Sequence, residues 1–472
     1  MTNRVYVVDL DGTLLRSDML FETFWNVAAQ HPRALPGILL SSGSRAELKE
    51  KLTQASDVDV TTLPYNEEVI ARIKAARAEG QRTALVTASN QALAERIAAH
   101  LGIFDEVHGS TAEHNLKGGN KAAFLQERFA EPGYVYAGDS TADLAVWEGA
   151  QEIVAVEAGP GLRRRIDALG KTTDYIGGGR GSLKPALTAV RPHQWLKNVL
   201  IFLPLLAAHD LSLSSVSVAL LAFIAFSMVA SSVYLTNDLL DLGPDRAHAR
   251  KCKRPFASGA LHLKHGTWMA PATLALGVLL SSLISGSFLL VMIAYYMTTT
   301  AYSFSLKRKM IIDICVLSGL YTLRVIAGGV AAEVMLSVWL LAFSMFLFFS
   351  LAAVKRQAEL TDGAASGKKK ASGRGYRVDD LPIVSMMSIS AGYTSVLVMA
   401  LYLSQPNVQD LYSSPYLLWG VCLVLLYWIS RVVMLTHRGQ MHDDPVIFAL
   451  KDRISRICLV LIAACGLGAY AI

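Results

Sequence analysis

The pattern of hydrophobic and polar positions divides the chain into two halves. Residues 1–180 mix charges with short apolar runs, as in a soluble α/β domain, whereas residues 195–472 consist of long apolar runs separated by short polar loops. These runs of about 17 to 25 residues match a bilayer core of roughly 30 Å at about 1.5 Å per helical residue. The pattern predicts a soluble domain at 1–175, a linker at 176–190 and an all-α membrane domain at 191–472.

Nine apolar segments are candidate transmembrane helices, and the first and last are the weakest. They are residues 195–208, 214–236, 267–283, 286–304, 312–332, 335–354, 382–403, 415–434 and 455–472. Lys and Arg gather in the loops after the second, fourth, sixth and eighth segments and are absent from the other loops. By the positive-inside rule, the basic loops and the amino-terminal domain face the cytoplasm of an inner (plasma) membrane. The odd span number places the carboxyl terminus outside.

Composition adds little to this division. Hydrophobic residues make up 53% of the 472 residues, and the net charge is +6. All five cysteines lie in the membrane half without metal-ligand spacing, so we expect them to be packing residues. We expect no nucleic-acid partner, and the sequence leaves the oligomeric state open, a homo-oligomer included.

Three segments of the first half end in polar residues. The run VYVVDLDGTLL leads to Asp9 and Asp11, TALVTASN contains Thr87 and Ser89, and YVYAGDSTAD contains Asp139 and Asp143. Their β-branched apolar runs predict buried parallel strands, whose carboxyl ends form the ligand edge of an open α/β sheet. Four carboxylates and a hydroxyl at this edge suit Mg²⁺ and a phosphate, because the metal offsets the repulsion between the acids and the anion.

These motifs resemble the haloacid dehalogenase superfamily of phosphotransferases over about residues 3–170. The resemblance implies a Rossmann-like domain in which Asp9 is the nucleophile that forms an aspartyl phosphate and Asp11 is the general acid and then base. It implies that Thr87 binds the phosphoryl group, together with a lysine that opens a helix, Lys121 in preference to Lys117. The expected Mg²⁺ ligands are Asp9, Asp139 and Asp143. The helical stretch between Asp11 and Thr87 fits a small cap.

The stretch VYLTNDLLDLGPDRAHARKCKRPFASG, residues 233–259, concentrates charges between two apolar runs. Asp238, Asp241 and Asp245 are three and four residues apart and share one helix face beside Asn237. Mg²⁺ bridging to a diphosphate would relieve their repulsion, and the following cations, including Arg246 and Arg254, suit phosphate oxygens. The alternative is an acidic helix end that pairs with those same cations.

A second constellation lies in YSFSLKRKMIIDICVLSGLYTLRVIAGG. Lys307 stands at its polar edge, Asp313 one turn into the next apolar run and Arg324 deep within it. Eleven residues are about three helical turns, so Asp313 and Arg324 are expected on one face. An arginine at that depth needs an anion, either a substrate group or an internal acid such as Asp313.

Residues 185–472 resemble the UbiA superfamily of intramembrane prenyltransferases, whose first aspartate motif matches NDxxDxxxD at Asn237 to Asp245. The second motif departs from the usual pair of acids, because this chain offers only Asp313. The stretches RPHQWLKN, RAHARKCKRPFASG, LRVIAGG, KRQAEL, GRGY and DDPVIFALKDR look like the decaprenyl-phosphate phosphoribosyltransferase group. That group transfers 5-phosphoribose from phosphoribosyl pyrophosphate to a polyprenyl phosphate.

This resemblance implies a role for each motif. Asp238, Asp241 and Asp245, with Asn237, would hold Mg²⁺ on the pyrophosphate. The donor phosphates would meet Lys197, Arg246 and Arg254. The candidates for the lipid phosphate are Lys307, Arg324, Lys355 and Arg356.

The fusion suggests two consecutive reactions, in which the soluble phosphatase removes the 5-phosphate of the membrane-bound product. The main alternative is a prenyltransferase that moves a prenyl group from its diphosphate to an aromatic or lipid acceptor. A non-enzymatic, transporter-like bundle with a regulatory domain would leave the acidic stripe without a function.

Overall fold

The structure, a computed structural model, describes part of the chain. It covers residues 4–111, 115–178, 182–365, 374–441 and 444–471. The chain divides into two compact units, Met1–Val190 with Tyr234–Pro271, and Arg191–Val233 with Ala272–Ile472. The second range of the first unit, Tyr234–Pro271, contains Asp238, Asp241 and Asp245, and we call it the aspartate segment. It belongs to the same unit as the soluble domain, although it lies between apolar runs.

The first unit contains a six-stranded sheet in which every pairing is parallel. Its order is β3-β2-β1-β4-β5-β6. The strands are β1 (Val5–Val8), β2 (Arg82–Asn90), β3 (Glu106–Ser110), β4 (Tyr134–Gly138), β5 (Glu152–Val156) and β6 (Thr173–Ile176). The α/β fold expected for this half is confirmed.

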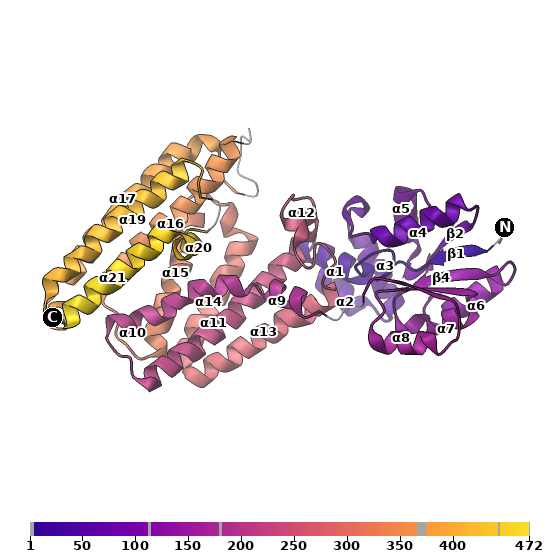
Figure 1. The fold of residues 1–472 in the computed structure, drawn as a ribbon, viewed down its shortest axis with the longest axis horizontal. Helices are drawn as coiled ribbons and strands as arrows, with labels where there is room; N and C mark the ends of the chain where they lie inside the picture. Colours follow the sequence, from indigo (N-terminus) through magenta and orange to yellow (C-terminus); the bar gives the residue numbers. More distant parts are fainter. Residues whose placement is uncertain (1–3, 112–114, 179–181, 366–373, 442–443, 472) are drawn as a thin grey trace. The chain divides into compact units, whose positions relative to one another are not determined.

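Helices cover both faces of this sheet (Figure 1). All four residues of β1 are buried, with Tyr6 and Val8 in one core and Val5 and Val7 in the other. The first core includes residues of α4 (Glu67–Ala78) and α5 (Gln91–Leu101). The second includes residues of α6 (Gly119–Phe129), α7 (Leu144–Gly149) and α8 (Pro160–Asp167). A strand buried on both faces needs this unbroken run of apolar residues.

Three helices follow β1 in the place expected for a cap. They are α1 (Met19–Gln30), α2 (Leu35–Ser41) and α3 (Arg45–Ala55). Asp18 begins α1 and Ser44 begins α3, each by accepting a backbone N–H of the first turn. The remainder of the expected cap is α4, which packs on the sheet.

Eight helices of the described residues are long and apolar enough to cross a membrane. They are α11 (Leu213–Leu240), α13 (Leu263–Ile284), α14 (Gly286–Phe304), α15 (Ile312–Ala331), α16 (Val338–Ala365), α17 (Leu381–Leu403), α19 (Trp419–His437) and α21 (Arg453–Ala471). Within the second unit, α16 packs along α15 and α17, and α19 packs along α17 and α21 (Figure 1). Seven of these helices lie within four residues of a predicted span at both ends, whereas α16 continues eleven residues beyond the predicted end at residue 354.

Both halves of the chain also contain short elements. They are η1 (Val60–Thr62), η2 (Thr141–Asp143), α9 (Lys184–Val190), α12 (Leu242–Arg246), η4 (Lys251–Lys253), η5 (Leu306–Arg308), η6 (Val378–Asp380), α18 (Pro406–Gln409), η7 (Pro415–Leu418) and α20 (Pro445–Lys451). The expected linker thus contains α9, and its residues 179–181 lie outside the described residues.

The first predicted span, residues 195–208, is not a continuous α-helix. This region consists of a 3₁₀ helix, η3 (Pro192–Phe202), followed by the five-residue α10 (Leu203–Ala207). Pro204 stands at the start of α10, where a proline fits because its missing N–H has no helical partner. The apolar pattern predicted the location of this segment but not its helix type.

Candidate active sites

Three carboxylates gather at the carboxyl edge of the sheet. Asp9 follows β1, and Asp139 and Asp143 follow β4, which pairs with β1. Ligand atoms of these three acids lie within 4.8 Å of one another, and among the described residues no other group of three acids, histidines or cysteines does so. Carboxylate oxygens at this spacing fit Mg²⁺. The sequence had placed the same three residues together.

Lys121 neutralises part of this charge from the start of α6. Its Nζ lies 2.9 Å from Asp9 Oδ1 and 3.8 Å from Asp143 Oδ1, and it donates to the Tyr136 hydroxyl at 2.9 Å. That hydroxyl donates to Asp143 Oδ1 at 3.0 Å. Burial alone would lower the pKa of Lys121, but the neighbouring carboxylates, Asp9 first, raise it on balance. Lys121 therefore stays charged beside Asp9, whereas Lys117 is exposed.

Asp11 is held in place by groups on both sides. Its Oδ1 accepts the Met19 N–H at 2.8 Å, and its Oδ2 accepts the Ser89 hydroxyl. Burial raises the pKa of Asp11 to about 7, and the nearby Asp18 carboxylate adds to this effect. Burial also raises the pKa of Asp9, to about 6, against the opposing charge of Lys121. A carboxyl group with a pKa near neutrality suits a residue that must donate and then accept a proton.

Gly12 and Thr87 help to shape the loops that carry the catalytic groups. Gly12 has a φ of +78°, and a Cβ there would lie 2.0 Å from Asp139 Oδ2, so a side chain at this position would collide with the acid. Thr87 is fully buried, and its hydroxyl accepts the Ser89 N–H at 3.0 Å. Thr87 is not among the described residues that line the adjacent cavity, so its expected phosphoryl contact stays a prediction.

The acids open into a cavity of about 250 Å³. Asp9, Asp11, Lys121, Asp139 and Asp143 line one part of it. Other lining residues come from the cap, from the loop before α6 and from the aspartate segment. They include Arg45 and Lys49 of the cap, Lys117 of the loop and His262 of the aspartate segment.

The aspartate segment carries its own charge cluster. Asp238, in the last turn of α11, and Asp245, in α12, are both buried, and both bind Arg254 Nη1, at 3.0 and 2.5 Å. Asp241 lies between the two helices, and its N–H donates to the Asn237 carbonyl. Burial raises the pKa of Asp245, against the charge of Arg254. Two of the three predicted acids, Asp238 and Asp245, therefore meet, and the Arg254 guanidinium neutralises their charge.

Arg246 has a partner that the sequence did not indicate. Its two terminal nitrogens bind the Glu22 carboxylate of α1, at 3.0 and 2.6 Å, and both side chains are buried. Glu22 also accepts the Ser17 hydroxyl, in the loop that follows Asp11. Removing one partner of a buried pair typically costs about 3–5 kcal/mol. In this structure Arg246 therefore ties the aspartate segment to the soluble domain, and its guanidinium does not face an open phosphate site.

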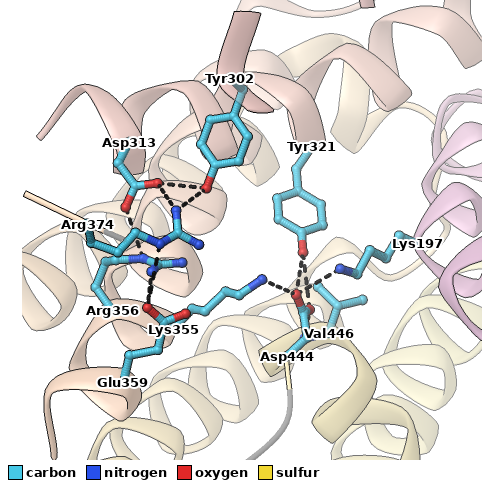
Figure 2. Close-up of polar contacts among 10 residues, drawn as sticks. All are labelled: Lys197, Tyr302, Asp313, Tyr321, Lys355, Arg356, Glu359, Arg374, Asp444 and Val446. Atoms are coloured by element: carbon cyan, nitrogen blue, oxygen red, sulfur yellow. Dashed lines mark hydrogen bonds and ion pairs between the residues drawn. The ribbon is translucent and has the colours of Figure 1, made fainter. Parts of the chain in front are cut away.

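In the second unit, two lysines converge on one carboxylate (Figure 2). Asp444 Oδ2 lies 2.8 Å from Lys197 Nζ and 3.1 Å from Lys355 Nζ, and Oδ1 accepts the Tyr321 hydroxyl at 3.1 Å. Asp444 also begins α20 by accepting the Val446 N–H. Burial would raise the pKa of Asp444, but Lys355 and Lys197 hold it well below its usual range. The two predicted phosphate-binding lysines are therefore neighbours.

Asp313 lies in a separate network of the same unit (Figure 2). Its carboxylate is fully buried and lies 3.0 Å from Arg356 Nε and 2.9 Å from Arg374 Nη1, and it accepts the Tyr302 hydroxyl at 2.7 Å. Glu359 adds a second acid beside Arg356. Asp313 thus neutralises two arginines, one of them in the GRGY motif, whose Gly373 lies outside the described residues.

Arg324 does not pair with Asp313, contrary to one expectation. Its Nε donates to Asn198 Oδ1 at 2.9 Å, and its other nitrogens donate to the Leu320 carbonyl and the Tyr295 hydroxyl. The guanidinium also lies over the Phe226 ring. Each of the three guanidinium nitrogens therefore has a partner inside the bundle, which fits a structural role. Lys307 is half-buried in η5.

Sequence comparison identifies the family of the second half. Residues 198–450 match the UbiA prenyltransferase family. The chain belongs to this family. Residues 6–148 match the haloacid dehalogenase-like hydrolases, so the chain is an enzyme that joins a UbiA-type transferase to a hydrolase domain.

Some relatives match both halves of this chain, and others match about 60% of it. The protein y4nM of Sinorhizobium fredii is 37% identical over 465 residues, which are 97% of this chain and 89% of that protein. Decaprenyl-phosphate phosphoribosyltransferase of Mycolicibacterium smegmatis is 33% identical over 297 residues, 60% of this chain and 92% of that protein. A UbiA homolog from Archaeoglobus fulgidus bound to GPP and Mg²⁺ is 14% identical and covers 61% of this chain and all of its own, with a TM-score of 0.46.

Three charged residues of these networks escaped the sequence analysis. Asp444 had a weak signal, since an acid before a proline is typical of a helix start. Both Asp444, in DDPVIFALKDR, and Arg374, in GRGY, lay in stretches noted for their resemblance. Glu22 had no signal, because a buried partner more than two hundred residues away leaves no local pattern.

Proposed function

We propose that the UbiA-type part transfers 5-phosphoribose from phosphoribosyl pyrophosphate to a polyprenyl phosphate. The bond between ribose C1 and the pyrophosphate oxygen breaks, and an oxygen of the lipid phosphate bonds to C1. Pyrophosphate leaves as the second product.

The observation that carries this proposal is the charge balance of the second unit. Asp313, the single acid of the second motif, is occupied by Arg356 and Arg374, and Asp444 is shared by Lys197 and Lys355. These four cations face two buried acids and the half-buried Glu359, so one positive charge is left over, which favours an anionic second substrate. A polyprenyl phosphate meets this requirement, whereas a neutral aromatic acceptor does not. The identity of about a third with a phosphoribosyltransferase supports the same substrates.

The aspartate segment is assigned to the donor. Asp238 and Asp245 share one cationic partner, Arg254, which supports a shared Mg²⁺ site for these two acids; Asp241 and Asn237 would complete that site. Bound Mg²⁺ would stabilise the charge that develops on the departing pyrophosphate. Arg254 would then turn from the acids to the donor phosphates, a ligand that its planar guanidinium matches.

The test is a product assay with the full chain in detergent and Mg²⁺. Labelled phosphoribosyl pyrophosphate and a polyprenyl phosphate are expected to yield a labelled lipid and pyrophosphate. Absence of labelled lipid, together with turnover of a prenyl diphosphate and an aromatic or lipid acceptor, would replace this proposal by prenyl transfer.

We also propose that the hydrolase domain removes the 5-phosphate of this product. Asp9 attacks the phosphorus while Asp11 gives a proton to the ribose O5 that leaves. Water then attacks the aspartyl phosphate and returns a proton to Asp11, releasing inorganic phosphate. Lys121, held 2.9 Å from Asp9, offsets the negative charge that Asp9 and the phosphoryl group bring together.

Replacing Asp444 by asparagine is expected to lower the apparent unfolding temperature by on the order of 10 °C. Two buried lysines would lose their counter-charge, at a cost of about 3–5 kcal/mol. If these lysines bind phosphate, added pyrophosphate should restore more stability to this variant than to the unmodified protein. Thermal unfolding in detergent measures both effects, with Asp410→Asn, at an exposed position, as the control. Equal responses to pyrophosphate would contradict the assignment of Lys197 and Lys355.

The Glu22–Arg246 pair supports a nine-span topology. If α11 crosses the membrane, a soluble domain paired with the segment after α11 would lie on the side where α11 ends, and residues 191–212 would then form a further crossing. Eleven 3₁₀ residues at about 2 Å each, continued by α10, reach about 30 Å, which is sufficient. A cysteine introduced at Asp210 should react with an impermeant maleimide from outside intact cells. Reaction only after lysis would exclude this crossing.

A further inference from the structure

The cavity of the hydrolase domain is larger than a phosphoryl group requires, and its lining continues beyond the catalytic carboxylates. Arg45 and Lys49 enter from α3 of the cap, four residues apart and therefore on one helix face. Lys117 enters from the loop before α6. The acids Asp18 and Glu50 also line this region. Cationic side chains thus enter the cavity from two separate elements, in addition to Lys121, which pairs with Asp9.

Lys49 is fixed in this lining. Its Nζ donates to the Ala88 carbonyl at 2.6 Å, next to Ser89, which binds Asp11. Burial lowers the pKa of Lys49, although the Asp11 and Asp18 charges act in the opposite direction. A half-buried ammonium group held at the end of β2 is available to an anion inside the cavity.

His262 reaches the same cavity from the aspartate segment. Three features attach this segment to the soluble domain: the Glu22–Arg246 pair, the hydrogen bond from Trp25 Nε1 to Thr267 Oγ1 at 3.0 Å, and the close approach of Gly259 to Arg16. Gly259 has a φ of +71°, and a Cβ there would lie 2.8 Å from the Arg16 carbonyl. A shared apolar core contains Phe21 and Trp25 of α1 together with residues of the aspartate segment: Leu235, Leu239, Leu242, Phe256, Leu261, Leu263, Met269 and Ala270.

We propose that Arg45, Lys49 and His262 form a subsite for a second anion, so that the hydrolase selects phosphomonoesters whose leaving group carries a further phosphate. This proposal rests on the proposed function, because the transferase product has this chemistry: a 5-phosphate on ribose and a phosphodiester at C1. The subsite binds the phosphodiester while Asp9 attacks the 5-phosphate. Because His262 belongs to the segment that carries the transferase motif, one part of the chain serves both reactions.

The experiment compares two soluble esters with the full chain and Mg²⁺. One is methyl ribofuranoside 5-phosphate, and the other carries a methyl phosphodiester at C1 as well. The unmodified protein is expected to hydrolyse the second with a kcat/KM at least about tenfold higher, as one or more charge-assisted hydrogen bonds would provide. Equal values for the two esters would overturn the proposal.

Two variants locate the preference. Arg45→Gln and His262→Gln should each raise KM for the two-phosphate ester about fivefold to tenfold, with kcat and all values for the one-phosphate ester unchanged. The matched controls are Lys51→Gln, on the same helix but paired with Glu47, and His265→Gln, whose ring neighbours that of His262. A variant that impairs both esters equally has only a structural effect, and this result would remove that residue from the subsite.

The transferase assay on the same preparation separates the two proposals. A preference for the two-phosphate ester without labelled lipid would refute the proposed transferase reaction and leave the subsite standing. Labelled lipid without this preference would support the transferase reaction and refute the subsite.

Discussion

Asp238→Asn is expected to reduce formation of labelled lipid by roughly a thousandfold or more. The amide keeps the shape of the side chain but removes a carboxylate that would hold Mg²⁺ on the pyrophosphate. Several kcal/mol of transition-state stabilisation depend on such a metal, and each 1.4 kcal/mol is about tenfold in rate. Transfer from labelled phosphoribosyl pyrophosphate at saturating Mg²⁺ measures the loss.

This variant should remain folded, because Arg254 keeps its shorter contact with Asp245. Hydrolysis of a soluble phosphomonoester should therefore stay within twofold of the unmodified protein. Asp410→Asn, an acid outside both clusters, serves as the control and should retain full transfer. Transfer by Asp238→Asn at more than about a tenth of the normal rate would contradict the metal assignment.

Asp9→Asn should abolish the hydrolase reaction, also by roughly a thousandfold or more, since an amide cannot form the aspartyl phosphate. Transfer should continue, so that the lipid product retains its 5-phosphate and accumulates in this form. Chromatography of the labelled lipid distinguishes the phosphorylated product from the dephosphorylated one. The expected pattern is phosphorylated lipid from Asp9→Asn and mainly dephosphorylated lipid from the unmodified chain.

Glu79→Gln, at an exposed position of the soluble domain, is the control for this experiment. Two results would count against the proposed sequence of reactions. If both proteins give only phosphorylated lipid, the hydrolase domain acts on another substrate. If Asp9→Asn also loses transfer, the two sites are not independent, and the shared unit that contains Glu22 and Arg246 would be the first place to look for the coupling.

Several site positions followed from the sequence because their geometry is local. Asp9, Asp139 and Asp143 stand at the ends of adjacent parallel strands, and adjacent strands bring their ends together in any such sheet. Lys121 follows the same logic, since the start of a helix lies at this edge. The eight long helices were predictable because membrane thickness sets the length of an apolar run.

The partners of the charged residues could not be predicted in the same way. Sequence spacing correctly predicted that Asp238 and Asp245 would lie together, but it left open whether a metal or a following cation joins them, and Arg254 does so here. Arg324 was expected near Asp313 from its helical spacing. Instead Arg356 of the next helix and Arg374 take that acid, because contacts between helices outweigh proximity within one.

The sequence by itself therefore determined the two-part organisation, the parallel sheet, the long apolar helices and the three acids that meet at the edge of the sheet. Each of these depends on periodicity or on short spacings that the chain carries locally. Only the tertiary structure decided that the aspartate segment belongs to the soluble unit, that Arg246 binds Glu22 and that Asp444 joins Lys197 to Lys355. These contacts join residues 89 to 247 positions apart, and burial, which makes an unpaired charge costly, selects them only once the chain has folded.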